Sequence, residues 1–146
     1  MITENIKCVV LADRHQGLTE GIRGLLETGF DAVVMVADEA SLRESAVRLK
    51  PAVVVLDLAL ARTDGLGLLR RLRARCPDVK LIVLSRHEEA STSRATIEAG
   101  ADAIVLTRAI AIDLLPAVDA VQAGRRFVSP GVRDPVPPGG NKDVPG

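Results

Sequence analysis

The chain has 146 residues, of which 47% are hydrophobic and only 1% aromatic, and its 19 basic and 19 acidic side chains give a formal net charge of zero. This length favours a single domain with an aliphatic core, and the balanced charge argues against a nucleic-acid footprint or attraction to an anionic membrane. No apolar stretch reaches the roughly 20 residues that a membrane-spanning helix needs, and the N-terminus lacks a signal-peptide pattern. Cys8 and Cys76 are lone cysteines, so we expect a reduced, cytoplasmic protein.

Short apolar runs alternate with helical patterns along the whole chain. The apolar runs predict buried strands at residues 6–12, 32–36, 52–58, 79–84 and 103–106. Apolar residues at helical spacing predict helices within residues 18–26, 42–49, 66–72, 88–99 and 114–121. Five such βα repeats predict an α/β fold, in which one five-stranded parallel, doubly wound sheet is covered by helices on both faces.

The fourth predicted helix differs from the others because its apolar stripe is thin. It contains Ser91, Thr92, Ser93 and Thr96, and serine and threonine are mediocre helix formers. We therefore expect this helix to be the least firmly packed element, which is where switching elements are usually found. A plain exposed helix is the alternative interpretation.

The C-terminal part of the chain combines a last helix with a change of composition. We expect Asp113 to cap the last helix, which would place Pro116 in the first turn, where no intrahelical N–H is needed. After Gly124, prolines and glycines without a period indicate a linker. The sequence thus predicts one folded domain over residues 1–128 and a flexible tail over residues 129–146.

Two acidic residues follow buried apolar runs. Asp13 comes after residues 8–12, and Asp57 ends residues 53–57. The carboxyl ends of parallel strands form the ligand-binding edge of such a sheet, so we expect these acids to meet there with the hydroxyl of Ser85. Two carboxylates at that edge can bind a cation, or one of them can attack a phosphoryl group.

These motifs resemble the receiver domains of bacterial two-component response regulators, the CheY-like family, and are nearest the NarL/LuxR type. The similarity runs from about Ile6 to Val132 and is carried by residues 11–15, 51–58, 64–65, 84–87, 99–101 and 124–130. The resemblance implies a flavodoxin-like sheet of strand order 2-1-3-4-5 and a signalling module that is not an enzyme. It further implies a sensor histidine kinase as donor and a homodimer, with no nucleic-acid or membrane contact through this domain.

Position by position, the resemblance makes Asp57 the phosphoacceptor, Ser85 the switch hydroxyl and Asp13 the first of two pocket acids. Asp13 and Asp57 would then hold Mg²⁺. Four family landmarks are altered: Arg14 replaces the second acid, Thr107 the lysine, Ile104 the switch aromatic and Ala61 a proline.

The altered positions predict a weak or absent Mg²⁺ site. Mg²⁺ is held by few carboxylates, and Arg14 replaces one of them with a positive charge. Two unit charges about 4 Å apart interact by roughly 4 kcal/mol at an effective dielectric constant near 20. We expect Arg14 to pair with Asp13 or Asp57 as a fixed cation in place of the metal.

Three other residues near this edge receive no role in the prediction. Arg108 follows the lysine position by one residue, so strand alternation points it to the other face. His15 and His87 are interpreted as common loop residues of the family.

Three functions stay open at this point. The first is a receiver domain that accepts a phosphoryl group on Asp57 from a histidine kinase and then changes its partner binding. The second is a pseudo-receiver, a binding module with phosphorylation-independent output, because Arg14 and Thr107 replace charged groups of the reaction. The third, a small flavodoxin-like enzyme or ligand-binding domain, lacks a glycine-rich phosphate loop and an aromatic platform. If the protein continues past Gly146, a helix-turn-helix effector is the expected continuation.

Overall fold

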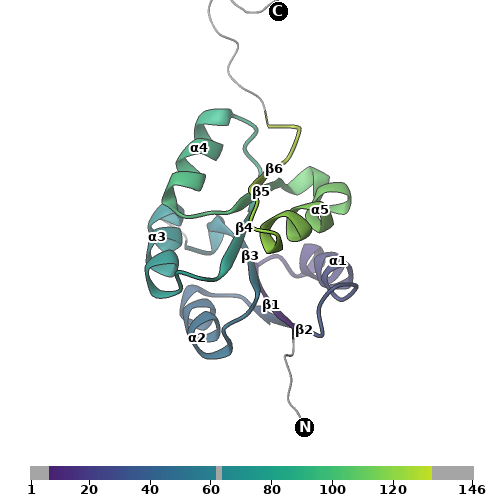
Figure 1. Ribbon diagram of the computed structural model, residues 1–146, viewed down its shortest axis with the longest axis vertical. Coiled ribbons are helices and arrows are strands. Elements are labelled where there is room, and N and C mark those ends of the chain that lie inside the picture. The colour runs from purple at the N-terminus through teal and green to yellow at the C-terminus, as the bar shows by residue number, and fades with distance from the viewer. Residues whose placement is uncertain (1–6, 62–63, 133–146) are drawn as a thin grey trace, which may run out of the picture.

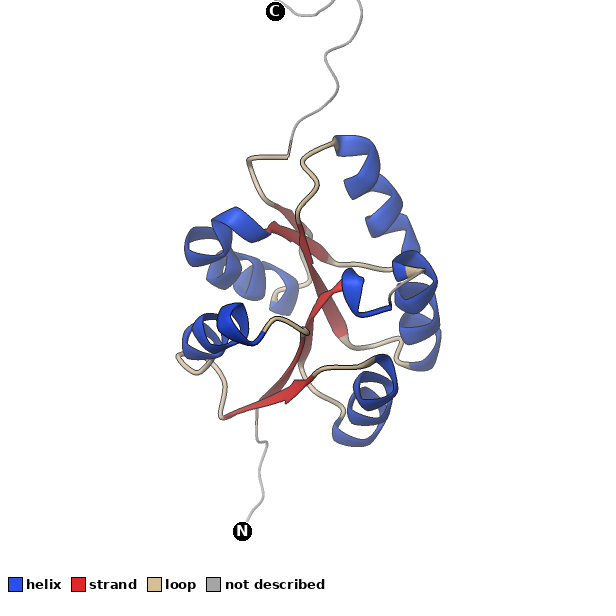
Figure 2. Ribbon diagram, turned by 180° about the vertical axis from the view of Figure 1, so that it is seen from behind, coloured by secondary structure: helices blue, strands red, loops and turns tan. Residues whose placement is uncertain are grey.

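The computed structural model describes residues 7–61 and 64–132. One parallel sheet has the strand order β2-β1-β3-β4-β5-β6. Helices α1 and α5 cover one face, and α2, α3 and α4 cover the other (Figure 1). Seen from behind, the strands lie between the two helical layers (Figure 2). Among the described residues, no helix combines the length and the apolar character that crossing a bilayer requires.

The elements follow one another in strict alternation. The strands are β1 (Cys8–Ala12), β2 (Ala32–Val36), β3 (Val53–Asp57), β4 (Lys80–Ser85), β5 (Ala103–Leu106) and β6 (Phe127–Val128). The α-helices are α1 (Gln16–Leu26), α2 (Glu39–Leu49), α3 (Gly65–Arg75), α4 (Ala90–Ala99) and α5 (Ile110–Gln122). Two short 3₁₀ helices, η1 (Leu58–Ala61) and η2 (Thr107–Ala109), follow β3 and β5.

The predicted parallel α/β fold and the order of its first five strands are confirmed, but the sheet has six strands rather than five. The sixth strand is held to β5 by hydrogen bonds from the Phe127 amide to the Asp102 carbonyl (3.3 Å) and from the Ser129 amide to the Ile104 carbonyl (2.9 Å). A two-residue strand is too short to leave a periodic pattern in the sequence, which is why the prediction missed it.

The sheet separates two aliphatic cores. In β1, Val9 and Leu11 face the core beneath α1 and α5, whereas Val10 and Ala12 face the core beneath α2, α3 and α4. Because both faces of the strand are buried, its sequence is a continuous apolar run instead of an alternating one. This arrangement fixes where the run must end, and Asp13 follows at the edge of the sheet.

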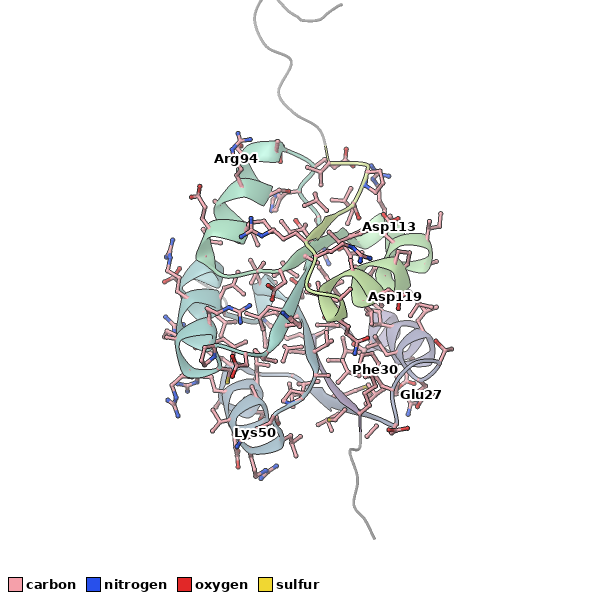
Figure 3. The ribbon with its side chains drawn as sticks, in the orientation of Figure 1. Glu27, Phe30, Lys50, Arg94, Asp113 and Asp119 are labelled. Atoms are coloured by element: carbon pink, nitrogen blue, oxygen red, sulfur yellow. The ribbon has the colours of Figure 1, made fainter. Side chains whose placement is uncertain are left out.

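The start of α5 differs from the prediction. The helix begins at Ile110, so Asp113 lies in its first turn and does not cap it, and Pro116 lies inside the helix. The prediction was wrong because η2 leads directly into α5 and moves the helix start upstream. Asp113 is buried and accepts a hydrogen bond of 2.8 Å from the Ser129 hydroxyl. Figure 3 labels Asp113 on α5.

Ser129 belongs to the folded part of the chain, although the predicted tail begins with it. It is only 2% exposed, and its hydroxyl oxygen accepts a hydrogen bond of 2.9 Å from the Leu106 amide. Folded structure therefore continues past residue 128, the boundary expected from the composition. Residues 133–146 of the predicted tail lie outside the described residues.

Helix α4 packs through small and hydroxyl-bearing side chains. Its buried residues are Ala90, Ser93, Thr96 and Ala99. The Thr96 hydroxyl donates to the carbonyl of Thr92 (2.8 Å), and the buried Ser93 hydroxyl has no hydrogen-bond partner among the described residues. Its weaker packing relative to the other helices stays a prediction.

Arg73 of α3 binds the amino-terminal ends of β4 and β5. Its guanidinium donates to the carbonyls of Gly100 (2.8 Å) and Val79 (2.7 Å) and to the carboxylate of Asp102 (2.6 Å). The same Asp102 oxygen accepts the amide of Leu81 (2.8 Å). Gly100 has a φ of +130°, and a Cβ there would lie 2.9 Å from the Cβ of Arg73, so this close approach requires glycine.

Candidate functional site

The structure brings the two predicted acids together at the carboxyl ends of β1 and β3. These strands are neighbours in the sheet, and Asp13 follows the last residue of β1 while Asp57 is the last residue of β3. The Asp13 side chain is 0% exposed and the Asp57 side chain 18% exposed. The Asp13 carboxylate is therefore buried, and the Asp57 carboxylate is accessible from solvent.

His15 lies against both carboxylates. Its Nδ1 is 3.1 Å from Oδ1 of Asp13 and 3.9 Å from Oδ2 of Asp57. Its backbone amide also donates to Oδ1 of Asp13 at 2.8 Å. The carbonyl of His15 accepts hydrogen bonds from the amide and the hydroxyl of Thr19 in α1 (3.0 and 2.7 Å). The backbone of His15 is thus fixed on both sides.

Sequence reasoning missed this histidine. The signal was the spacing Asp-x-His directly after a strand, because an aspartate side chain often binds the backbone amide two residues further on. That local turn places the imidazole beside Asp13. Its approach to Asp57 depends on the pairing of β1 with β3, which the sequence pattern alone does not supply.

The two carboxylates differ in how their oxygens are satisfied. Oδ1 of Asp57 accepts the amide of Ala59 at 2.9 Å. Oδ1 of Asp13 has the two contacts with His15, whereas Oδ2 of Asp13 is buried and has no hydrogen-bond partner among the described residues. A buried polar atom without a partner is costly and uncommon in folded proteins. This oxygen is therefore able to accept a hydrogen bond or to bind a cation.

Arg14 does not take the position expected for it. The residue is exposed, and within residues 7–61 and 64–132 it forms no ion pair with Asp13 or Asp57. The expected ion pair is not formed, because Arg14 follows Asp13 in the turn and extends into solvent. The basic side chain beside the acids is His15.

The other predicted site residues lie at the ends of β4 and β5. The Ser85 hydroxyl oxygen accepts the amide of His87 at 3.0 Å, and the Thr107 hydroxyl donates to the Ser85 carbonyl at 3.2 Å. Ser85 and Thr107 line a hollow of about 270 Å³. Ile104 is 1% exposed and belongs to the packed sheet.

Arg108 does not turn back toward the acids. Its Nε donates to Oε2 of Glu88 at 2.7 Å, which joins the loop after β4 to the segment after β5. Thr107, where the resemblance led us to expect a lysine, offers only a short hydroxyl side chain, and Arg108 is bound to Glu88.

Comparison with known proteins decides the family. The family model of the response regulator receiver domain matches residues 9–119. The chain belongs to this family. The matched segment contains both acids, His15, Ser85 and Thr107, so the site described above lies within the receiver domain.

Curated relatives and solved structures agree with this assignment. The chain is 31% identical to the transcriptional regulatory protein DegU of Brevibacillus brevis, over 90% of this chain and 56% of that protein. It is 33% identical to the nitrate/nitrite response regulator NarP of Escherichia coli K12, over 83% of this chain and 57% of that protein. The chain thus spans little more than half of the length of these relatives.

Two solved structures share the fold of this receiver domain. A LuxR-family response regulator from Aurantimonas sp. SI85-9A1 has a TM-score of 0.79 and 27% identity, covering 88% of this chain and 93% of that one. The isolated receiver domain of RcsB from Salmonella enterica serovar Typhimurium, in its apo form, has a TM-score of 0.76 and 28% identity, covering 88% and 96%.

The donor atoms of this receiver domain could hold a divalent cation, but they are not the all-oxygen set that Mg²⁺ prefers. One ligand atom each from Asp13, His15 and Asp57 lies within 4.8 Å of the other two. The Asp13 oxygen that has no partner among the described residues could bind a cation. Mg²⁺, however, demands near-ideal octahedral oxygen coordination. Here the third donor is an imidazole nitrogen, so the set does not match what Mg²⁺ prefers.

Proposed function

We propose that this receiver domain accepts a phosphoryl group on Asp57 from a sensor histidine kinase and that the modification changes the binding of a protein partner. The observation that carries the proposal is the position of Asp57 at the end of a central strand, with one oxygen held by the Ala59 amide and the side chain 18% exposed. A carboxylate oriented in this way can attack a phosphoryl donor. The domain is a signalling module and not an enzyme in this proposal.

The residues near Asp57 support a slow phosphorylation of this aspartate and a change in the hydrogen bonding of Ser85. Ser85 carries a hydroxyl at the adjacent strand end, where it could donate to a phosphoryl oxygen after giving up its hydrogen bond of 3.5 Å to the His87 carbonyl. Neither Thr107 nor Arg108 supplies the positive charge that stabilises phosphoryl transfer. We therefore expect Thr107→Lys to speed up the modification of Asp57.

Intact-mass measurement after incubation with acetyl phosphate tests the proposal. The unmodified chain should gain the mass of one phosphoryl group, and Asp57→Asn should gain none. Asp64→Asn is a matched control, because Asp64 is a helix-capping carboxylate that accepts the Gly67 amide at 2.8 Å. An unchanged mass in the wild-type chain, even after long incubation, would refute phosphorylation of Asp57.

A pseudo-receiver is the second candidate, and a specific observation favours it. Among the described residues, no arginine or lysine forms an ion pair with Asp13 or Asp57, while Arg108 is bound to Glu88. In that case Asp57→Asn would leave partner binding unchanged, and acetyl phosphate would leave the mass of the chain unchanged. The two candidates therefore give opposite results in one experiment.

The names of the relatives suggest the wider setting. One solved structure is described as two RcsB dimers bound to two parallel DNAs, and DegU is named a transcriptional regulatory protein. We infer that this receiver domain forms a homodimer in the cytoplasm and controls a DNA-binding domain elsewhere in the full-length protein. Sedimentation of the chain before and after phosphorylation tests the homodimer.

A further inference from the structure

We propose that Asp13, His15 and Asp57 form a binding site for a zinc-type transition-metal ion, in which the imidazole of His15 is a metal ligand. The proposal concerns the metal alone and holds whether or not Asp57 is phosphorylated. It differs from a magnesium site in its ligand set, because a nitrogen donor enters where an acidic residue is absent.

The two donor distances from His15 are close to those of tetrahedral coordination. Zinc bonds to imidazole nitrogen and carboxylate oxygen measure roughly 2.0–2.2 Å, which places tetrahedral donor atoms about 3.3–3.5 Å apart. Nδ1 of His15 lies 3.1 Å from the Asp13 oxygen and 3.9 Å from the Asp57 oxygen. A half-ångström adjustment of the Asp57 carboxylate would bring it to the required separation, and this side chain is the more exposed of the two acids.

The buried carboxylate supplies independent support. Asp13 is 0% exposed in its side chain, and its Oδ2 has no partner among the described residues, so the structure holds a carboxylate that is shielded from solvent at the base of the site. Buried charges in proteins are paired or coordinate metals. Since Arg14 is exposed and unpaired with Asp13, a bound cation is the group that would complete this site.

The choice of donors selects the class of metal. Imidazole suits zinc, copper, nickel and iron, whereas all-oxygen sites suit magnesium, calcium and manganese. His15 contributes the nitrogen when its proton resides on Nε2, and its side chain is 49% exposed, so water can accept that N–H. Three protein ligands then leave a fourth tetrahedral position open, as in zinc sites that bind water or substrate.

The histidine is held in place before any metal arrives. The His15 backbone is fixed by the Asp13 carboxylate on one side and by Thr19 on the other. Ligation would therefore order little more than the imidazole ring, which is favourable because ordering flexible groups opposes binding.

The test is titration of the full 146-residue chain with Zn²⁺ and with Mg²⁺, followed by calorimetry and by amide NMR shifts at residues 13–15 and 57–59. We expect one Zn²⁺ site with a Kd at least tenfold lower than that of Mg²⁺. His15→Asn should weaken Zn²⁺ binding at least tenfold and leave Mg²⁺ binding within about twofold. Asparagine is also a good residue at a helix N-cap, so this variant should keep the start of α1.

His87→Asn is the matched control, because it removes the other histidine of the chain, which lies in the loop after β4. It should leave Zn²⁺ binding unchanged. Equal loss in the two histidine variants, Zn²⁺ binding that survives His15→Asn, or tighter binding of Mg²⁺ than of Zn²⁺ would each overturn the proposal. Phosphorylation of Asp57 is measured separately by mass. Failure of the zinc proposal would therefore not decide whether Asp57 is phosphorylated, and failure of phosphorylation would not decide whether zinc binds.

Discussion

The two ends of the sheet differ in how fully their charged side chains are hydrogen-bonded. At the amino-terminal end of β4 and β5, Arg73 donates to several carbonyls and to Asp102, and Asp102 in turn accepts a backbone amide. At the carboxyl end, Asp13 keeps a buried oxygen without a partner beside the carboxylate of Asp57. At one end the charged groups bind one another and the backbone, whereas at the other end a buried carboxylate oxygen has no partner among the described residues.

The largest expected effect comes from removing Arg73 at the amino-terminal ends of β4 and β5. Arg73→Ala should lower the free energy of unfolding by about 3 kcal/mol, because it removes the guanidinium that donates to Asp102 and to four backbone carbonyls. Urea denaturation measures the change. Arg70→Ala removes an exposed arginine of the same helix and should cost less than about 0.5 kcal/mol. Equal costs for the two variants would show that Arg73 does not bind the strand ends as described.

The C-terminal segment provides the next largest effect. Ser129→Ala removes the hydroxyl that joins the Leu106 amide to the buried Asp113 carboxylate, and it should cost about 2 kcal/mol of unfolding free energy. Pro130→Ala changes the adjacent exposed residue and is the control. If Ser129→Ala proved as neutral as the control, the folded domain would end before residue 129.

A substitution of Asp13, at the carboxyl end of the sheet, should raise the free energy of unfolding. Asp13→Asn keeps an acceptor for the His15 amide but removes a buried charge that lies close to Asp57. In metal-free buffer we expect the free energy of unfolding to rise by about 1 kcal/mol. A loss of stability of that size would mean that the Asp13 carboxylate is already satisfied without a ligand.

The smallest effect is a pH dependence at the start of α2. The Asp38 carboxylate accepts the Ser41 amide and hydroxyl (2.7 and 3.1 Å), and these bonds hold the pKa of Asp38 below its usual range. Because the pKa is lower in the folded state, its stabilisation is present above the ordinary value of about 4 and is lost as the pH falls through the lowered value. Asp38→Asn does not titrate, so the stability gap between it and the wild type should shrink on acidification. A gap that stayed constant down to about pH 3 would contradict this.

The sequence predicts most where packing on both sides dictates residue type. The bounds of β2 and β5 agree with the apolar runs, and Asp13 and Asp57 meet at the expected edge. These features follow because a doubly covered parallel strand must be apolar until it leaves the sheet.

The features that the sequence did not predict depend on three-dimensional neighbours. The short strand β6 exists only because β5 offers it hydrogen-bond partners. His15 approaches Asp57 only because β1 pairs with β3. The direction of the Arg14 side chain is set by the turn after Asp13, so its charge alone suggested an ion pair that does not form.

We propose that Asp57 is a phosphoacceptor whose modification is sensed at the ends of β4 and β5. The most direct measurement is the amide NMR spectrum of the chain with and without beryllofluoride, which mimics a phosphoryl group, recorded in the presence of a divalent metal. We expect shifts around Asp57, Ser85 and Ile104 that disappear in Asp57→Asn. Unchanged spectra of the wild-type chain at these positions would contradict it.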